Sequence, residues 1–543
     1  MKSFLKSSVA ATLLFSGSAG FALAEHQTHP ETGETLAHTQ NLNFRIGDNP
    51  GSLDPGQVED TLGNDMIRQM FSGLYTQDDS GSVVPDMAVS VETSDDKMTY
   101  TFTLREGVKW SDGRPVTAHD FEYSWKRVAD PVNASGYASY LASMAVANAQ
   151  DVIDGKKPVD DLGVVALDDY TLQVTLDKPL PYFLKMLPHA TTFAVPRWTI
   201  EEHGAAWTRA ENIVVNGPYK ITQYNIGERI VMERNPMYWN NENIILDEAV
   251  FHIISDENQA FNRYAAGELD STEVPTGQFM KLKKERPEET FNLPILCSYY
   301  YVMNLREDGP EYLKDPRVRK ALSYAIDRYT ITEKVLAAGQ IPAYTFTPAS
   351  TADFEVPFLQ DAQRSQMERV GMAKQMMEDA GYGPDNPLEI DLIYNTSEGH
   401  KKIAIAVSQM WKQNLGVETN ISNMEWKTML DERDAGNFEV ARHGWCADYN
   451  EASTFLSVFK STSSYNDAKY SNPAFDELLN QSETMDDPQS NYTIAEAILQ
   501  DDAALIPIYH YTAPRLMAQD MKGYPWENAQ ENWYLRTFYR IEK

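Results

Sequence analysis

Apolar and polar residues alternate strictly over residues 98–104, with Tyr, Phe and Leu side chains on one face and threonines on the other. A period of two residues is typical of a half-buried β-strand. The same alternation over residues 170–176 predicts a second strand. Between these two segments, Thr117 is suited to cap a helix that continues through Arg127.

The second half of the chain contains a strand–helix–strand pattern. Residues 388–392 alternate and predict a strand, after which Ser397 can cap a helix over residues 400–415. Gly416 is suited to end that helix, and residues 417–421 resume an extended pattern. Alternation of strands and helices favours lobes of mixed α/β structure.

A further helix is predicted over residues 315–339. Asp315 is a capping residue, Pro316 occupies the first helical position, and Gly339 marks the end. The chain shows no internal repeat, low-complexity segment or flexible linker. Composition therefore does not reveal where one lobe ends and the next begins.

The first residues have the features of an export signal. Lys2 and Lys6 precede a mostly apolar or small segment, residues 9–23, and residues 22–24 form an A-x-A cleavage site. We expect removal after Ala24, because the segment is too short and too often broken by serine and glycine to serve comfortably as a membrane anchor. No cysteine lies near the cut, so we expect a free periplasmic protein. Residues 25–40 are polar and predict a loose start.

Size and charge narrow the class further. The ~520 residues expected after cleavage exceed what one hydrophobic core organises, so two or three lobes are expected. The net charge of −32 would repel nucleic acid and anionic lipid. High solubility explains this charge more simply than a preference for cationic ligands. The two cysteines, Cys297 and Cys446, favour a disulfide in an exported chain, with two buried thiols as the alternative.

The sequence lacks the common catalytic and metal-binding motifs. It has no H-E-x-x-H, P-loop, G-x-S-x-G or G-x-G-x-x-G, and its ten histidines have no ligand spacing. We therefore expect no enzyme activity, no cofactor and no metal. Catalytic carboxylates can lie far apart in sequence, so a hydrolase remains an alternative.

Several segments together resemble one known family. The most distinctive is residues 442–451, RHGWCADYNE. Further segments of the same kind occur at residues 110–113, 117–121, 216–219, 233–236, 297–301, 317–319, 321–322, 395–397 and 400–402. The chain resembles the periplasmic oligopeptide-binding proteins of ABC importers, extracellular solute-binding protein family 5, over nearly its whole mature length.

The resemblance implies an α/β fold like that of periplasmic binding proteins, with two lobes around a hinged cleft and a third, extra domain. It implies a discontinuous domain I (residues 25–71, 196–296 and 516–543), a domain II (72–195) and a domain III (297–515). Peptide backbone would add as a strand to segments on both sides of the cleft. Peptide side chains would lie in hydrated pockets that adapt to many shapes.

The resemblance also assigns roles at the two ends of a peptide. Asp448 would pair with the N-terminal ammonium, which cannot be enclosed without an anionic partner. Arg442 and His400 would receive the carboxylate at different distances for different peptide lengths. His400, with Lys401 and Lys402, is also expected in the first helical turn, where positive charge opposes the helix dipole and an anion would relieve the conflict. Leu336 stands where the family has a third cation.

Other positions would line the cleft. The resemblance places Arg433 in a side-chain pocket with aromatic walls, and gives the segment 59–61 a backbone role on the other lobe. Cys297 and Cys446 match the family's disulfide. The expected lining residues, besides those already named, are Arg433, Trp426, Gly444, Trp445, Cys446, Glu59, Asp60, Thr61, Tyr137 and Tyr511.

The expected function is capture of short peptides by a monomeric protein that delivers them to the membrane permease of an ABC importer. A dedicated carrier of cell-wall (murein) tripeptide is the first alternative, for which Arg433 could pair with an acidic ligand side chain. A periplasmic peptide hydrolase and a holdase for exported proteins are further alternatives.

Overall fold

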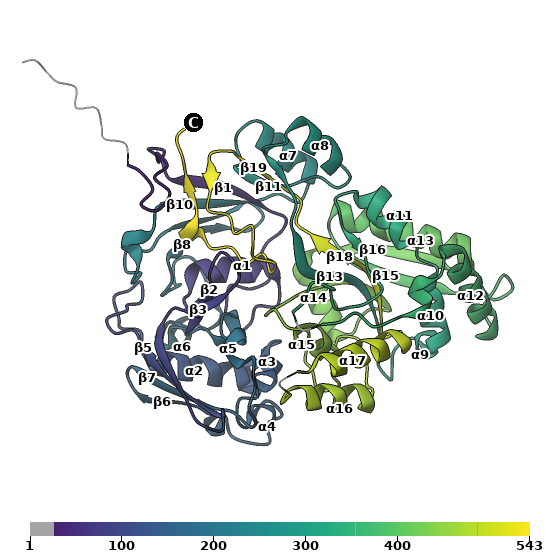
Figure 1. Ribbon diagram of the computed structural model, residues 1–543, viewed down its shortest axis with the longest axis horizontal. Helices are drawn as coiled ribbons and strands as arrows, with labels where there is room; N and C mark the ends of the chain where they lie inside the picture. Colours follow the sequence, from purple (N-terminus) through teal and green to yellow (C-terminus); the bar gives the residue numbers. More distant parts are fainter. Residues whose placement is uncertain (1–26, 353, 486) are drawn as a thin grey trace, which may run out of the picture.

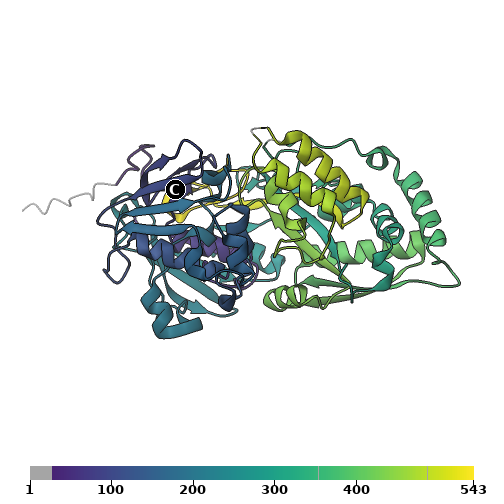
Figure 2. The same ribbon diagram turned by 90° about the horizontal axis from the view of Figure 1, so that it is seen from below.

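The computed structural model describes residues 27–352, 354–485 and 487–543, which form two lobes side by side (Figures 1 and 2). The expected signal segment, residues 1–24, lies outside the described residues. Within the part described, no helix combines the length and apolar character needed to cross a bilayer.

A seven-stranded sheet in the first lobe gathers strands from the beginning, middle and end of the chain. Its central strand β1 pairs in parallel with β10 and β11, whereas β8, β9 and β10 form an antiparallel meander. In spatial order the strands are β12 (Thr290–Phe291), β19 (Arg515–Met517), β11 (Ser271–Glu273), β1 (Asn41–Ile46), β10 (Glu248–Ile253), β9 (Arg229–Arg234) and β8 (Tyr219–Asn225).

A four-stranded antiparallel sheet lies at the other end of the same lobe, with helix α2 beside it (Figure 1). The two predicted strands are its central pair, and Phe102 and Leu172 on their shared inner face are fully buried. Thr117 begins α2 in a capping box with Asp120, as the sequence predicts. The strands are β4 (Ala88–Thr93), β5 (Thr99–Leu104), β7 (Thr171–Thr175) and β6 (Val164–Asp168).

Helices and two short ribbons complete the first lobe. The helices are α1 (Thr61–Met70), α2 (Ala118–Ala129), α3 (Ala138–Ser143), α4 (Ala149–Ile153), α5 (Phe183–Met186), α6 (Arg197–His203), α7 (Glu257–Ala265) and α8 (Phe279–Glu285). The ribbons pair β2 (Tyr75–Gln77) with β3 (Val83–Pro85), and β20 (Met521–Lys522) with β21 (Tyr539–Arg540).

The second lobe is built on a six-stranded mixed sheet. The predicted strand–helix–strand unit is confirmed: Ser397 accepts a hydrogen bond from the His400 amide at the start of α13, and Gly416 ends that helix in the left-handed conformation. In spatial order the strands are β14 (Ile341–Pro342), β18 (Leu505–Thr512), β13 (Pro294–Met303), β17 (Val440–Cys446), β15 (Glu389–Asn395) and β16 (Glu418–Met424).

The helices of this lobe cover the sheet and pack in pairs, α10 with α12 and α16 with α17. Trp411 of α13 is fully buried and donates its indole N–H to the Leu322 carbonyl at 2.8 Å. The helices are α9 (Glu311–Lys314), α10 (Pro316–Tyr324), α11 (Arg328–Thr330), α12 (Gln366–Asp379), α13 (Glu398–Leu415), α14 (Trp426–Ala435), α15 (Ser453–Leu456), α16 (Pro473–Ser482) and α17 (Gln489–Asp501).

Two local predictions are wrong. The single helix expected over 315–339 is interrupted at Asp327, whose extended backbone and side chain begin a new helix, α11, that continues as a π-helix. The start of the chain is not loose where it is described: Leu36 is buried, and the His29 ring lies 4.2 Å from that of Tyr539. In both places contacts with distant residues outweigh the local sequence pattern.

A narrow neck joins the lobes. Within the described residues the chain passes between the lobes twice, at the start of β13 and just after β18. These two strands pair with each other, beginning with Pro294 opposite Thr512. The Ala513 amide donates to the Leu293 carbonyl at 2.7 Å on the side of the first lobe. Both crossings lie at the ends of strands, and a few residues at the ends of elements commonly form the hinge between two lobes.

Candidate functional site

A cavity of about 720 Å³ lies between the two lobes and receives residues from both. The first lobe contributes the start of α1 and the segments around residues 136 and 189, and the second contributes β17, α13 and α14. Every site residue predicted from the sequence lines it: Glu59, Asp60, Thr61, Tyr137, His400, Trp426, Arg433, Arg442, Gly444, Trp445, Cys446, Asp448 and Tyr511.

Strand β17 presents an open edge to this cavity. It pairs with β13 along its full length, but β15 pairs with it only at Val440 and Ala441. The Ala447 amide donates to the Leu296 carbonyl of β13. Because antiparallel pairing alternates, the backbone groups of Gly444 and Cys446 point to the opposite edge, where an extended chain can pair with them.

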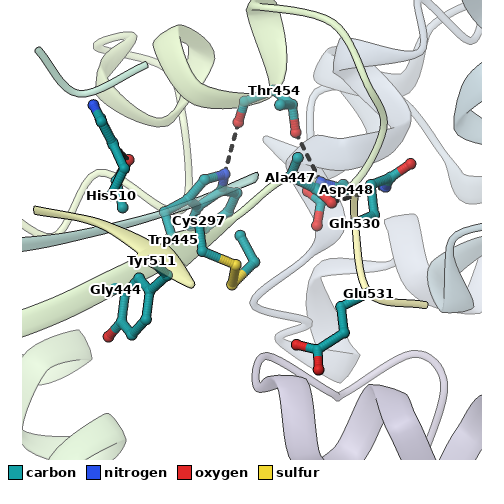
Figure 3. The surroundings of a disulfide bond; sticks show 12 residues. Cys297, Gly444, Trp445, Ala447, Asp448, Thr454, His510, Tyr511, Gln530 and Glu531 are labelled. Atoms are coloured by element: carbon teal, nitrogen blue, oxygen red, sulfur yellow. Dashed lines mark hydrogen bonds between the residues drawn. A yellow bond between two sulfur atoms is a disulfide. The ribbon is translucent and has the colours of Figure 1, made fainter. Parts of the chain in front are cut away.

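The disulfide is confirmed, and the alternative of two free thiols is wrong. Cys297 and Cys446 are bonded, and they are directly opposed residues of β13 and β17 with Cα atoms 4.0 Å apart. The bond ties the open-edged strand to its neighbour beside the cavity (Figure 3).

The segment after β17 is held by hydrogen bonds from both lobes (Figure 3). Thr454 accepts from the Trp445 indole through its carbonyl at 2.8 Å and from the Asp448 amide through its hydroxyl at 3.0 Å. Gln530, which the C-terminal chain brings back to the first lobe, donates to the Ala447 carbonyl at 2.9 Å. Asp448 is thus placed by its backbone, and its side chain lines the cavity.

The Asp448 carboxyl group is buried without a cation. Burial raises its pKa to about 8, only partly offset by the Tyr137 hydroxyl. The nearest basic group, His189 Nε2, lies 3.5 Å from Oδ1, but burial lowers the His189 pKa to about 3, so the imidazole is neutral. Among the described residues no other basic side chain lies within ion-pair distance of Asp448, so the site lacks one positive charge.

Cationic groups lie in another part of the same cavity. Arg442 donates to the Tyr511 hydroxyl at 2.6 Å and to the Asn395 amide oxygen at 3.2 Å, and within the described chain it has no carboxylate partner. Burial and the Arg442 charge hold the His400 pKa well below its usual value. His400 is therefore neutral until an anion enters, and a bound carboxylate would raise its pKa.

The three basic residues at the start of α13 do not act together. His400 lines the cavity, whereas Lys401 and Lys402 are exposed and do not line it. Lys402 instead donates to the Thr276 carbonyl of the first lobe at 3.2 Å. Leu336 also reaches the cavity wall and contributes an apolar surface there.

The segment 59–61 belongs to the opposite wall. Asp60 accepts from the Gly63 amide at 2.8 Å as the N-cap of α1 and from the Gly51 amide at 2.9 Å. Both carboxyl oxygens thus serve the protein backbone, and the pKa is raised to about 6 by burial. Glu59 and Thr61 also line the cavity.

Aromatic rings form the wall around Asp448. The Tyr137 ring lies 4.9 Å from that of His189 at an interplanar angle of 16°, and 6.4 Å from that of Trp445 at 6°. Tyr465 packs against both Tyr137 and Trp445. Trp426 lines the cavity from the first turn of α14, and its indole N–H lies beside the Asp60 carboxyl group of the opposite wall, whose pKa it lowers.

Arg433 pairs with the carboxylate of Asp467, a residue that the sequence does not predict to line the cavity. Its Nε lies 3.2 Å from Asp467 Oδ2, and His443 Nε2 approaches the same oxygen at 3.2 Å. The Arg433 charge and the hydrogen bond from His443 lower the Asp467 pKa despite its burial. His189 and Asp467 had no recognisable signal in the sequence, because each reaches the cavity from a loop.

Comparisons with known proteins agree with this geometry. The profile described as "Bacterial extracellular solute-binding proteins, family 5 Middle" matches residues 82–467. The periplasmic oligopeptide-binding protein OppA of Salmonella typhimurium is 45% identical over 515 residues, 94% of each chain. The crystal structure of Haemophilus influenzae OppA in complex with the peptide RPPGFSPFR is 40% identical, with a TM-score of 0.90 over 94% of this chain and 100% of that one.

Two structures of a third relative match this chain to different extents. The Escherichia coli murein tripeptide binding protein MppA is 43% identical, and one of its structures matches with a TM-score of 0.91 over 94% of this chain and 100% of that one. Its unliganded open form matches over 94% and 99% with a TM-score of only 0.65. The structure described above therefore departs from that open form and has its lobes brought together around the cavity.

Proposed function

Because the chain belongs to family 5 of the bacterial extracellular solute-binding proteins, we propose that it is a periplasmic protein that captures short peptides between its lobes and delivers them to an ABC importer. The observation that carries this proposal is the charge arrangement of the cavity. A buried carboxyl group at Asp448 and a buried guanidinium at Arg442 both lack an opposite charge among the described residues. A peptide supplies an ammonium group and a carboxylate on one extended chain.

The strand edge between these groups explains how different peptides can share the site. Pairing of peptide backbone with Gly444 and Cys446 requires no particular side chain. Asp448 would pair with the ammonium group, and Arg442, with His400 beside it, would receive the carboxylate. Tyr137, Trp426 and Trp445 would bound the side-chain pockets, and Tyr511 would orient Arg442.

Closure would enclose the peptide. The lobes touch beside Asp448, where the Ser464 hydroxyl donates to the Gly136 carbonyl across the lobes at 2.6 Å. The segment 59–61 would then face the peptide from the first lobe, with Glu59 and Thr61 beside the ligand and Asp60 holding the backbone in place.

A carrier dedicated to murein tripeptide is the second candidate, since MppA is nearly as similar to this chain as OppA is. A hydrolase has no comparable support, because the family consists of solute-binding proteins and the cavity's buried carboxyl groups have the structural and pairing roles described above. We propose that the chain acts as a monomer, without cofactor or catalysis.

The three larger sheets support a division into three domains. We propose a discontinuous domain I of residues 25–71, 196–296 and 516–543, a domain II of residues 72–195 and a domain III of residues 297–515. The seven-, four- and six-stranded sheets support this division, because each falls almost entirely within one of the three. The permease would then recognise the two lobes in their closed arrangement.

Native mass spectrometry of protein purified without refolding tests the function. We expect a monomer with heterogeneous co-purified peptides of a few residues, released intact on denaturation. A single murein-derived tripeptide would favour the dedicated carrier, and cleavage of an added tripeptide over hours would favour a hydrolase. Absence of peptides, together with no binding of added tripeptides by calorimetry, would refute the proposal.

A further inference from the structure

One part of the cavity carries more negative than positive charge. It is bounded by Glu59 of the first lobe and by Arg433, Asp434, Asp467 and Lys469 of the second, all of which line the cavity. We refer to these five residues as the acidic subsite. It holds three carboxyl groups and two cationic groups, and the His443 imidazole beside it is neutral because burial lowers its pKa to about 4.

The arginine of this subsite is already paired. Arg433 and Asp467 are 6% and 7% exposed and form an ion pair of 3.2 Å, which His443 supports from the other side. The Asp467 carboxylate therefore neutralises the Arg433 guanidinium, and this buried pair adds no net charge to the subsite.

The remaining carboxyl groups have no such partner. Among the described residues neither the Glu59 nor the Asp434 carboxyl group lies within ion-pair distance of a basic side chain. Glu59 packs over Gly136, where a Cβ atom would lie 1.6 Å from its Oε1, so the chain accommodates this carboxyl group by having no side chain there. Asp434 lies in the last turn of α14, where a negative charge also opposes the helix dipole.

The charges of these groups act on one another. Burial, together with the Asp434 and Asp467 charges and against the opposing Arg433 charge, raises the Glu59 pKa to about 7. Lys469 and Asp434 are both exposed at the rim, where water screens their charges. Among the less exposed groups, the carboxyl groups of Glu59 and Asp467 outnumber the one guanidinium of Arg433, so a cation would relieve their repulsion and a further carboxylate would add to it.

We propose that the acidic subsite selects a basic side chain of the bound peptide, which makes a peptide containing lysine or arginine a preferred ligand. This inference rests on the proposed function and makes it more specific. It also disfavours ligands whose side chain at this position is acidic, despite the presence of Arg433. Asp467 acts as a positioning residue, because it neutralises the Arg433 charge and so determines the sign of the subsite's net charge.

The test is a positional scan of trialanine by calorimetry. Lysine, its uncharged analogue norleucine, and glutamate are placed at each of the three positions in turn. At one position we expect the lysine peptide to bind about tenfold more tightly than the norleucine peptide, because the Glu59 carboxyl group is partly buried whereas that of Asp434 is exposed. At the same position the glutamate peptide should bind more weakly than the norleucine peptide. Equal binding of lysine and norleucine at all positions, or preference for glutamate, would overturn the inference.

Matched variants locate the effect. Asp434→Asn should reduce the lysine-to-norleucine ratio severalfold, whereas Asp431→Asn should leave it unchanged. Asp431 is an exposed aspartate of the same helix that pairs with Lys427 and does not line the cavity. Asp467→Asn frees Arg433 and should raise the affinity for the glutamate peptide relative to norleucine. Equal ratios in the Asp434 and Asp431 variants would contradict the assignment.

The two levels of the proposal fail differently. If neither trialanine nor any substituted peptide binds the wild-type protein, the proposed function is wrong. If trialanine binds and the charge of the added side chain has no effect, only the acidic subsite is wrong.

Discussion

Replacement of Asp448 by asparagine tests the central ion pair of the proposed complex. The substitution keeps the size of the side chain and removes its charge. Loss of one partner from a buried charge pair commonly costs about 2–5 kcal/mol. The structure lowers this range, because the Asp448 pKa of about 8 means that ionising the carboxyl group at pH 7 already requires about 1.4 kcal/mol. Subtracting this cost leaves an expected loss of about 0.6–3.6 kcal/mol, or about 3- to 450-fold in affinity at pH 7.

The peptide offers a second way to delete the same interaction. Acetylation of the N-terminus removes the ammonium charge, so an acetylated tripeptide should bind wild-type protein with a loss of similar size. Calorimetric titration of wild type and Asp448→Asn with free and acetylated tripeptide gives a complete double-mutant cycle. The two changes together should cost clearly less than their sum, since each removes one partner of the same pair.

The cycle also defines how the reasoning would fail. Acetylated peptide that binds wild type as tightly as free peptide would show that no ammonium group meets Asp448. Strictly additive losses would show that the carboxyl group and the ammonium group act independently. Urea unfolding of Asp448→Asn serves as the control, because the substitution should not destabilise a carboxyl group that is already protonated at pH 7 in the closed cavity.

Three further predictions follow from the structure. Asp448 must be ionised to bind free peptide but not to bind acetylated peptide. The ratio of the two affinities, free over acetylated, should therefore rise by up to about tenfold per pH unit from pH 5 to 7.5, a range below the pKa of the peptide amine. A ratio that calorimetry finds independent of pH would contradict the raised Asp448 pKa. Removal of the disulfide by Cys297→Ser with Cys446→Ser should lower the free energy of unfolding by about 5 kcal/mol in the chain-entropy model, because the bond closes a sequence separation of 149 residues; unchanged urea midpoints would refute this. Arg442→Ala and His400→Ala should weaken peptides of different length to different extents, and equal losses across di-, tri- and tetrapeptides would show that the two residues do not divide the carboxylate positions.

Signals that act over a few residues were readable from the sequence. Thr117 caps α2, Ser397 caps α13, and Gly416 ends α13, because each effect depends on the residue's own backbone and its nearest amides. The break at Asp327 was not readable. There Arg328 turns inward and donates to the Pro507 carbonyl of β18, a contact that no local pattern encodes.

The cavity shows the same difference between local signals, which the sequence reveals, and contacts between distant residues, which it does not. The predicted lining residues meet at one cavity, but they were found through the family resemblance, since spacing alone does not bring residue 59 to residue 448. His189 and Asp467 were missed because both lie in loops with no periodicity or motif. The acid excess around Arg433 depends on the folded distances between Glu59, Asp434 and Asp467, and a charge count along the chain does not contain it.

The narrow neck between the lobes also makes the protein suitable as an optical reporter. Because the two crossing strands lie side by side at Leu293 and Ala513, a small rotation there would be amplified into a larger displacement at the far rims. Val132 and Met367 are exposed side chains, one on each lobe, and neither lines the cavity. A donor and acceptor dye at these two positions would convert peptide capture into a change of fluorescence energy transfer without altering any group that touches the ligand.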